Sequence, residues 1–360
     1  MPDYSLTPAW PVAAFPNLRR LTAWQYGNHS TLAPWLQQLG SLQHLQDLDL
    51  TLHDAYSSSD LTPQLQLPAL PAVTRLSLFS LVFSTTFHIC LANIPLLSQL
   101  EIGGYGTVDL AGDRGQAAAQ AGLVARDSGS SSKSGSSSAG KLVWAKLSVT
   151  RLIADFSLMP ALAHLEVTVR SLPELEGAAS IAAATALTQL RLLDSYALPD
   201  YRRAAWPLKL LRSLPPSLRA LSGPSWSTEL AEAVGGLTQL HALSVAYHGE
   251  EPTIPPPEAP LWPSLRALHI PANAVPQELR HASRLQVLSF RANHLSADDL
   301  SLLATLPALR HLRTEALGIG PQGEATTRQA LQGAMPWLQS IDTGDLGTEE
   351  FFSEAMALLG

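Results

Sequence analysis

The sequence predicts an α/β solenoid, in which stacked repeats place short strands in a parallel sheet on the concave side and helices or loops on the convex side. Three observations predict it. A motif of the form Leu-x-x-Leu-x-Leu recurs along most of the chain. Proline often stands two positions before its first leucine, and helix-like segments fill the intervals. Such repeats cannot bury their apolar side chains alone, so they must stack on one another.

The motif fits neither an amphipathic helix nor a simple strand. In RLQVLSFRANHL (284–295) the apolar residues Leu285, Leu288, Phe290 and Leu295 follow steps of three, two and five. A helix would need steps of three and four, and a half-buried strand would alternate strictly. The pattern therefore describes a strand and the turn that leaves it. About 13 copies occur, mostly 20 to 31 residues apart, with first positions at Leu18, Leu45, Val73, Leu97, Trp144, Leu162, Leu187, Leu218, Leu240, Leu265, Leu285, Leu309 and Leu338.

The residues around the motif mark where each strand begins. Proline precedes it in MPALAHLEV (159–167) and WPSLRALHI (262–270). Proline fixes its own φ and disfavours a helical conformation in the residue before it, so it ends one element and directs the chain into a strand. Between motifs, SADDLSLLATL (296–306) is typical of a helix. Its Ser296 and Asp299 predict a capping box.

These motifs resemble the leucine-rich repeat family, in its intracellular type with one strand and one helix per repeat. The resemblance covers about residues 15–345. The family pattern continues with Asn after the strand, and only Asn273 and Asn293 match that position, so the repeats are irregular. The resemblance implies a horseshoe with a parallel concave β-sheet, and it implies that partners bind on this sheet.

Four segments are predicted along the chain. Residues 1–14 form an N-terminal segment and 15–345 contain the repeats. Within the repeats, residues 111–141 are expected to be a disordered insertion, because the run ARDSGSSSKSGSSSAGK (125–141) carries little apolar area to bury; a linker between two domains is the alternative. Residues 346–360 predict a C-terminal capping helix over the last repeat, because terminal repeats need a cover.

Composition narrows the functional classes. The formal net charge is -7, and the pI is about 5.9, so the charge balance gives no sign of the basic face that nucleic acid requires. The single cysteine, Cys90, cannot form an intrachain disulfide. No uncharged apolar run reaches the length of a membrane span. We therefore expect an intracellular, cytoplasmic, monomeric protein that binds no nucleic acid and no membrane.

The sequence predicts no enzyme and no cofactor. Gly318, Gly320 and Gly323 match GxGxxG, but outside the βαβ context that dinucleotide binding needs. A turn followed by a helix with Pro321 in its first turn is the better interpretation. On the predicted concave face His269 and His311 are two strands apart, about 10 Å, which is too far to share a metal ion bound at about 2 Å. No metal site is predicted.

The remaining candidate site is the concave face itself. We expect a non-enzymatic interaction module that binds a protein or peptide through the side chains between the leucines. Exposed aromatic residues are the expected anchors. Two alternatives rest on family analogy: the substrate-recognition subunit of a ubiquitin ligase, for which residues 1–14 are too short to hold an adaptor-binding motif, or a structural component of the ciliary axoneme. The candidate partner-binding residues are Trp24, Asp47, Asp49, Phe79, Glu101, Glu166, Arg191, His269, Arg291, His311 and Arg313.

Overall fold

The computed structural model divides into two compact units, each described by itself. The first contains residues 1–187 and 194–196, and the second contains 188–193 and 197–360. The structure describes residues 14–26, 29–53, 64–110, 141–169, 175–194, 208–225, 228–246, 261–270, 272, 275–290, 295–314, 320–343, 351–352 and 355–357. The predicted insertion 111–141, apart from Lys141, and nearly all of the predicted N-terminal segment 1–14 lie outside these residues.

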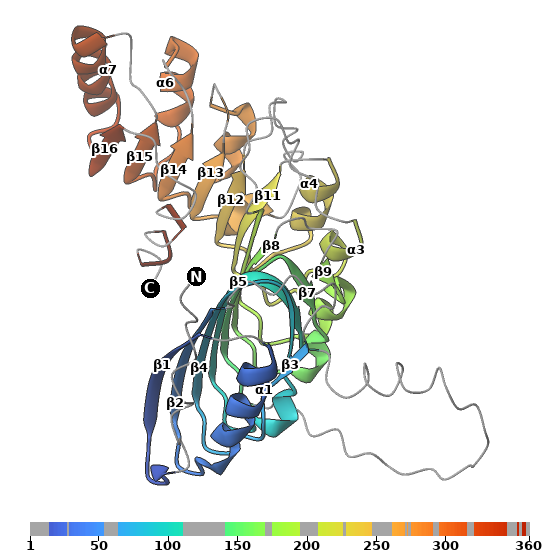
Figure 1. The fold of residues 1–360 in the computed structure, drawn as a ribbon. Coiled ribbons are helices and arrows are strands. Elements are labelled where there is room, and N and C mark those ends of the chain that lie inside the picture. The colour runs from blue at the N-terminus through green and yellow to red at the C-terminus, as the bar shows by residue number, and fades with distance from the viewer. Residues whose placement is uncertain are drawn as a thin grey trace, which may run out of the picture. The chain divides into compact units, whose positions relative to one another are not determined.

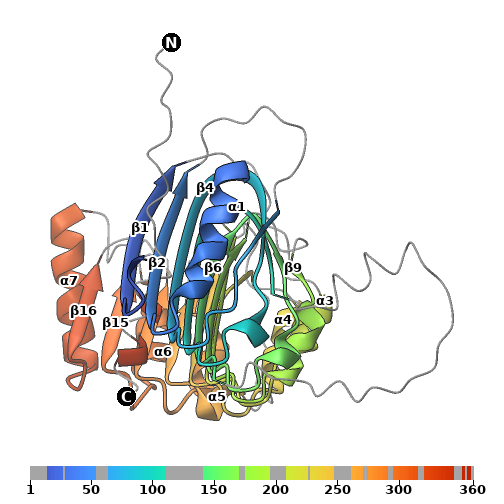
Figure 2. The ribbon, with the colours of Figure 1, turned by 60° about the horizontal axis from the view of Figure 1, so that its bottom comes forward.

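The first unit is built on a parallel sheet whose strands are the predicted motifs. Its main strands are hydrogen-bonded in the order β1-β2-β4-β5-β6-β8. Figure 2 shows β1, β2 and β4 side by side, with helix α1 (His29–Gln38) in front of the sheet. The strands are β1 (Arg20–Tyr26), β2 (Asp47–His53), β4 (Arg75–His88), β5 (Gln99–Asp109), β6 (Trp144–Val149) and β8 (His164–Val169).

Buried leucines hold these strands in register. Leu48 of β2 pairs with Leu76 of β4, which pairs with Leu100 of β5, and all three are fully buried. Burial of one such side chain stabilises the fold by about 1.5–3 kcal/mol. Buried and partly exposed residues alternate along β2, because successive side chains point to opposite faces of the sheet. The side chains that point away from the leucines form the surface that we call the ladder face.

The other side of the first unit differs from the prediction of one helix per repeat. The second halves of β4 and β5 pair with each other and with short strands, giving a second parallel ladder. These short strands are β3 (Gln64–Gln66), β7 (Arg151–Ile153) and β9 (Leu175–Glu176). Single-turn helices such as η3 (Leu91–Asn93) and η4 (Phe156–Leu158) complete the repeats. Only α1 is an α-helix among the described residues of this unit.

The predicted repeat start at Trp144 is wrong by two positions. Gln99 of β5 pairs with Trp144, Leu100 with Ala145, and Glu101 with Lys146. The first leucine of this repeat is therefore Leu142, which is fully buried, and Ala145 takes the place of the second leucine. Since side chains alternate with a period of two, a shift of two leaves the same residues on the ladder face.

The second unit repeats the arrangement with α-helices in most intervals (Figure 1). Its parallel strands are β10 (Gln189–Asp194), β11 (Ala220–Ser225), β12 (Ala242–Ala246), β13 (Ala267–Ile270), β14 (Val287–Phe290), β15 (His311–Thr314) and β16 (Ser340–Thr343). Its helices are α3 (Leu208–Leu211), α4 (Thr228–Gly235), α5 (Leu261–Ser264), η7 (Gln277–His281), α6 (Ala297–Leu303) and α7 (Gly320–Ala334).

Both units therefore confirm the predicted fold class, an α/β repeat solenoid with a parallel sheet. The helix predicted to begin near Pro321 is also confirmed, because α7 begins at Gly320. The GxGxxG residues that the structure describes thus open a helix between β15 and β16.

Of the predicted capping segment, residues 346–360 (the tail), the structure describes 351–352 and 355–357, and these contact strands that precede the last repeat. Its described residues Phe351, Phe352 and Ala355 are buried in one cluster with Ala220, Ala242, Ala267 and Val287. Those four residues belong to the ladder face of β11 to β14, so the described residues of the tail cover this face (dark red in Figure 1). The apolar character of these four positions explains the location, because apolar aromatic side chains leave water there.

The predicted capping box at Ser296 is confirmed, and its Asp299 has a further role. The Asp299 carboxylate accepts hydrogen bonds from the Ser296 backbone N–H (2.8 Å) and from the Val275 backbone N–H of the preceding repeat (2.9 Å). The Ser296 hydroxyl accepts from the Asp299 N–H in return. One buried carboxylate thus both caps α6 and joins two repeats.

We predict that Asp299→Ala lowers the free energy of unfolding by about 2–4 kcal/mol, since it removes the cap and leaves a buried N–H unpaired. Urea denaturation of the full chain measures this change. Asp298→Ala is the matched control, because Asp298 is an exposed neighbour in the same turn. Equal losses in the two variants would show that the hydrogen bonds of Asp299 contribute nothing specific.

Candidate functional site

The ladder face of the first unit brings most of the predicted acidic and aromatic residues together. Strand register places Trp24, Thr51, Phe79 and Gly103 in one row across β1, β2, β4 and β5. A second row contains Thr22, Asp49, Ser77, Glu101, Lys146 and Glu166. A third contains Arg20, Asp47, Arg75, Gln99, Trp144 and His164. Neighbouring residues of a row are about 4.8 Å apart.

Two large aromatic side chains stand in the first row. Trp24 is 69% exposed and Phe79 is 43% exposed, and they are two strands apart, about 10 Å. The Phe79 ring lies over Gly103, where a Cβ would come within 2.7 Å of its Cδ2. Glycine at 103 therefore makes room for the ring, and the short Thr51 separates the two aromatic residues. Tyr105, which the sequence analysis missed, adds a third exposed aromatic side chain (51%) farther along β5.

The charged residues of the two rows beside the aromatic row leave an excess of one carboxylate, because Asp47, Asp49, Glu101 and Glu166 stand with Arg20, Arg75 and Lys146. Asp47 forms an ion pair with Arg20 (2.8 Å), and Glu166 forms one with Lys146 (3.0 Å). Asp49 and Glu101 form no ion pair within the part of the chain that the structure describes. Burial lowers the pKa of His164 below its usual value of 6.5, which disfavours a positive charge at the far end of the face. The ladder face therefore offers apolar anchors next to two carboxylates.

Most of the predicted partner-binding residues in the second unit are buried or contact other residues of the same unit. Arg191 is buried, with 8% of its surface exposed. The His269 Nδ1 lies 2.9 Å from the Ser289 hydroxyl, and its ring contacts the Phe351 ring at a centroid distance of 5.3 Å. Arg313 forms an ion pair with Asp342 at 3.5 Å. Arg291 lies outside the described residues. That these residues contact a partner stays a prediction in this unit.

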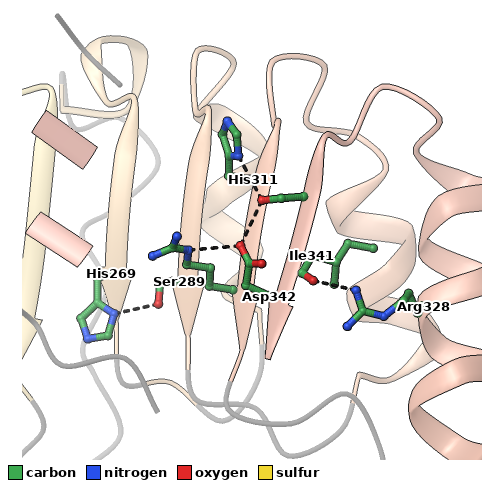
Figure 3. A network of polar contacts seen from close by, with 8 residues as sticks. His269, Ser289, His311, Arg328, Ile341 and Asp342 are labelled. Carbon is green, nitrogen blue, oxygen red and sulfur yellow. Dashed lines mark hydrogen bonds and ion pairs between the residues drawn. The ribbon is translucent and has the colours of Figure 1, made fainter. Parts of the chain in front are cut away.

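Figure 3 shows a His-Ser-Asp group on β15 and β16 of the second unit. The His311 Nδ1 lies 3.0 Å from the Ser340 Oγ, and that hydroxyl donates to the Asp342 carboxylate at 3.1 Å. Since the only hydroxyl proton goes to Asp342, the His311 Nδ1–H must donate to Ser340. A hydrolytic triad needs the opposite order, with the histidine between the serine and the carboxylate and accepting the serine proton. The group therefore orders the sheet edge and does not activate a nucleophile.

The described residues were compared with the requirements of a metal site and of a membrane-spanning helix. Within them, no three His, Cys, Asp or Glu side chains form a group that could hold a metal ion. None of the described helices has the length and apolar character needed to cross a membrane.

A basic row precedes the strands of the second unit. Arg219, His241, Arg266, Gln286 and Arg310 are linked successively by backbone hydrogen bonds, such as the His241 N–H donating to the Arg219 carbonyl. Burial, followed by the charges of Arg266, Arg219 and Arg284, lowers the pKa of His241 below its usual value. The contribution of the three arginines to this shift, which is smaller than that of burial, is consistent with a cluster of positive charges here. Sequence analysis did not recognise the row, although Arg or His stands just before Ala220, Ala242 and Ala267 in the sequence.

The fold and the exposed face define the class of the protein as a parallel-sheet repeat solenoid. No protein-family model matches the chain, and no curated protein matches it. Among solved structures, it is similar to an internalin from Listeria monocytogenes with 16% sequence identity and a TM-score of 0.45. The similarity covers 91% of this chain and 88% of the internalin chain. The fold class stated above rests on the strand registers and the buried leucines.

Proposed function

We propose that this protein belongs to the leucine-rich repeat family and is a non-enzymatic interaction module. The ladder face of the first unit binds a protein or peptide partner. The observation that carries the proposal is the pair of exposed aromatic side chains, Trp24 and Phe79, in one row of a rigid sheet. Large exposed apolar side chains mark binding sites, and aromatic residues are frequent energetic anchors.

The charges beside the aromatic row define the chemistry of the partner. Asp49 and Glu101 lie in the row next to Trp24 and Phe79. A matching segment presents an apolar side chain to the aromatic pair and Lys or Arg to the carboxylates. Such complementarity accelerates association and excludes acidic partners. This assigns Trp24, Phe79, Asp49 and Glu101 to the contact, with Asp47 and Glu166 held by their neighbouring cations.

Replacing the aromatic pair tests the proposal. We expect Trp24→Ala or Phe79→Ala to weaken partner binding by at least about 30-fold, which corresponds to the roughly 2 kcal/mol of an energetic anchor. Affinity capture from cells of the source organism, with wild type and variants as bait, identifies the partner. Titration calorimetry then measures its affinity.

Leu96→Ala is the matched control, because Leu96 is also exposed and apolar but precedes β5 in a turn. It should retain the partner, and all three variants should melt within a few degrees of wild type. If the aromatic variants bind the partner as wild type does, the ladder face is not the site. A substrate receptor of a ubiquitin ligase or an axonemal component would use the same face, and the identity of the captured protein distinguishes these roles.

A further inference from the structure

The ladder face of the second unit carries an apolar strip that the first unit lacks. Strand register places Ala220, Ala242, Ala267 and Val287 in one row across β11 to β14, and we call this row the alanine strip. The strip spans about 14 Å. In the first unit the corresponding row contains Arg20, Asp47, Arg75 and Gln99. Small apolar side chains on four neighbouring strands leave a shallow trough that suits bulky apolar groups.

The described residues of the tail fill this trough. Phe351 and Ala355 are four positions apart, as are Phe352 and Met356, a spacing typical of residues on one side of an amphipathic helix. Phe351, Phe352 and Ala355 are buried against the strip, and Met356 packs beside them. The Phe351 ring also contacts the His269 ring (Figure 3 shows His269 beside the Ser289 hydroxyl). This is the geometry of an amphipathic helix bound in a groove.

The charges next to the strip match those of the tail. The basic row residues Arg219, His241 and Arg266 immediately precede Ala220, Ala242 and Ala267. None of the three has an ion-pair partner in the described residues. The tail sequence TEEFFSEAMALLG contains Glu349, Glu350 and Glu354 and no basic residue. An acidic segment with adjacent aromatic residues therefore suits this face, because its aromatic side chains fit the trough and its charge is opposite to that of the basic row.

We propose that the alanine strip is a second docking surface, for an acidic amphipathic helix of another protein that carries two adjacent aromatic residues. The protein's own tail occupies this surface in cis and competes with that helix. The inference does not depend on the proposed function, because it concerns a different unit and its test needs no natural partner. A segment tethered close to its site acts at an effective concentration of about 1 mM. The surface becomes accessible to a partner only when that partner binds it more tightly than the tail does, or when the tail is released.

A labelled synthetic peptide of residues 348–360 tests this proposal on the full chain. We expect the double variant Phe351→Ala/Phe352→Ala to bind the peptide at least about tenfold more tightly than wild type, since the competing tail is weakened. Adding Ala242→Glu to that variant should abolish binding by placing a charge in the strip. A peptide with both phenylalanines replaced by alanine should not bind. A peptide with its glutamates replaced by glutamine should bind more weakly and with less salt dependence.

A second measurement uses the unaltered protein, in case the double variant does not fold. Hydrogen exchange of the wild-type chain is followed while the peptide is added to several mM. We expect the amides of residues 351–357 to lose protection as the peptide displaces the tail, while those of β11 to β14 stay protected. A folded double variant that binds no better than wild type would overturn the proposal, as would tail protection unaffected by the peptide. The proposal would also be overturned if the wild-type protein were a dimer in which the tail of each copy occupies the alanine strip of the other copy.

Discussion

Gly104→Ala is expected to lower the free energy of unfolding of the first unit by about 2–6 kcal/mol, combining backbone strain with overpacking. Gly104 has a φ of +125°, a conformation that residues with a side chain rarely adopt. A Cβ at this position would also collide with the carbonyl oxygen of Ser80 on β4. Here β4 and β5 interrupt their regular pairing, between Ser80 and Thr85, before the second ladder begins. The substitution therefore disturbs the point that joins the two ladders.

Gly103→Ala is the matched control for this prediction. Gly103 is the adjacent residue and has no positive φ, and its Cβ would meet only the side chain of Phe79, which is partly exposed and can turn aside. We expect its effect on stability to stay below about 1 kcal/mol. Urea denaturation followed by tryptophan fluorescence compares the two variants with wild type. Equal stability of Gly104→Ala and wild type would contradict the described bend.

Leu97→Ala is expected to lower the free energy of unfolding by about 2–5 kcal/mol, because it removes a buried leucine and leaves a cavity. Leu97 is the first leucine of its repeat and is almost completely buried. In a solenoid each repeat is stabilised by its neighbours, so the loss should extend to the repeats on both sides. Hydrogen exchange should show that the backbone amides of β4 and β6, as well as those of β5, exchange faster than in wild type.

Leu96→Ala serves as the control, because this adjacent leucine is 38% exposed. The two variants make the same chemical change one position apart, so their difference isolates burial at the motif position. We expect Leu96→Ala to change stability by less than about 0.5 kcal/mol. If both variants lost the same stability, the repeat would not be in the register described.

The strands of both units could be predicted from sequence because the leucine spacing determines them. Each predicted second leucine from Leu21 to Ile341 lies in the sheet, but Leu147 pairs with Ile102, a residue in the third position of its motif. In the repeat at 142–149 Ala145 replaces the second leucine, and the nearby Trp144 gave a better apparent match at the wrong position. The second ladder of β3, β7 and β9 was missed because two- and three-residue strands leave almost no periodic signal.

The candidate site could be predicted only in part, since a sequence pattern shows which side chains leave the core but not what covers them. Trp24 and Phe79 are exposed as their positions imply, whereas Val287 and Ser289 are buried. The sequence does contain a signal for this difference. LRAL, LHAL, LRAL and LQVL (218–221, 240–243, 265–268 and 285–288) place a small apolar residue where the first unit has Arg20, Asp47, Arg75 and Gln99. That row and the phenylalanines of the tail are far apart in sequence, so only the structure reveals their contact.

Site-specific photo-crosslinking tests most directly whether the ladder face of the first unit binds a partner. A photoreactive phenylalanine analogue is placed in turn at Trp24, at Phe79 and at Ala92, which is exposed on η3 outside the ladder face. Mass spectrometry then identifies the proteins joined to each position in cells. The proposed function predicts that positions 24 and 79 crosslink to the same partner and that position 92 does not. A partner that crosslinks at 92 and at neither aromatic position would contradict it.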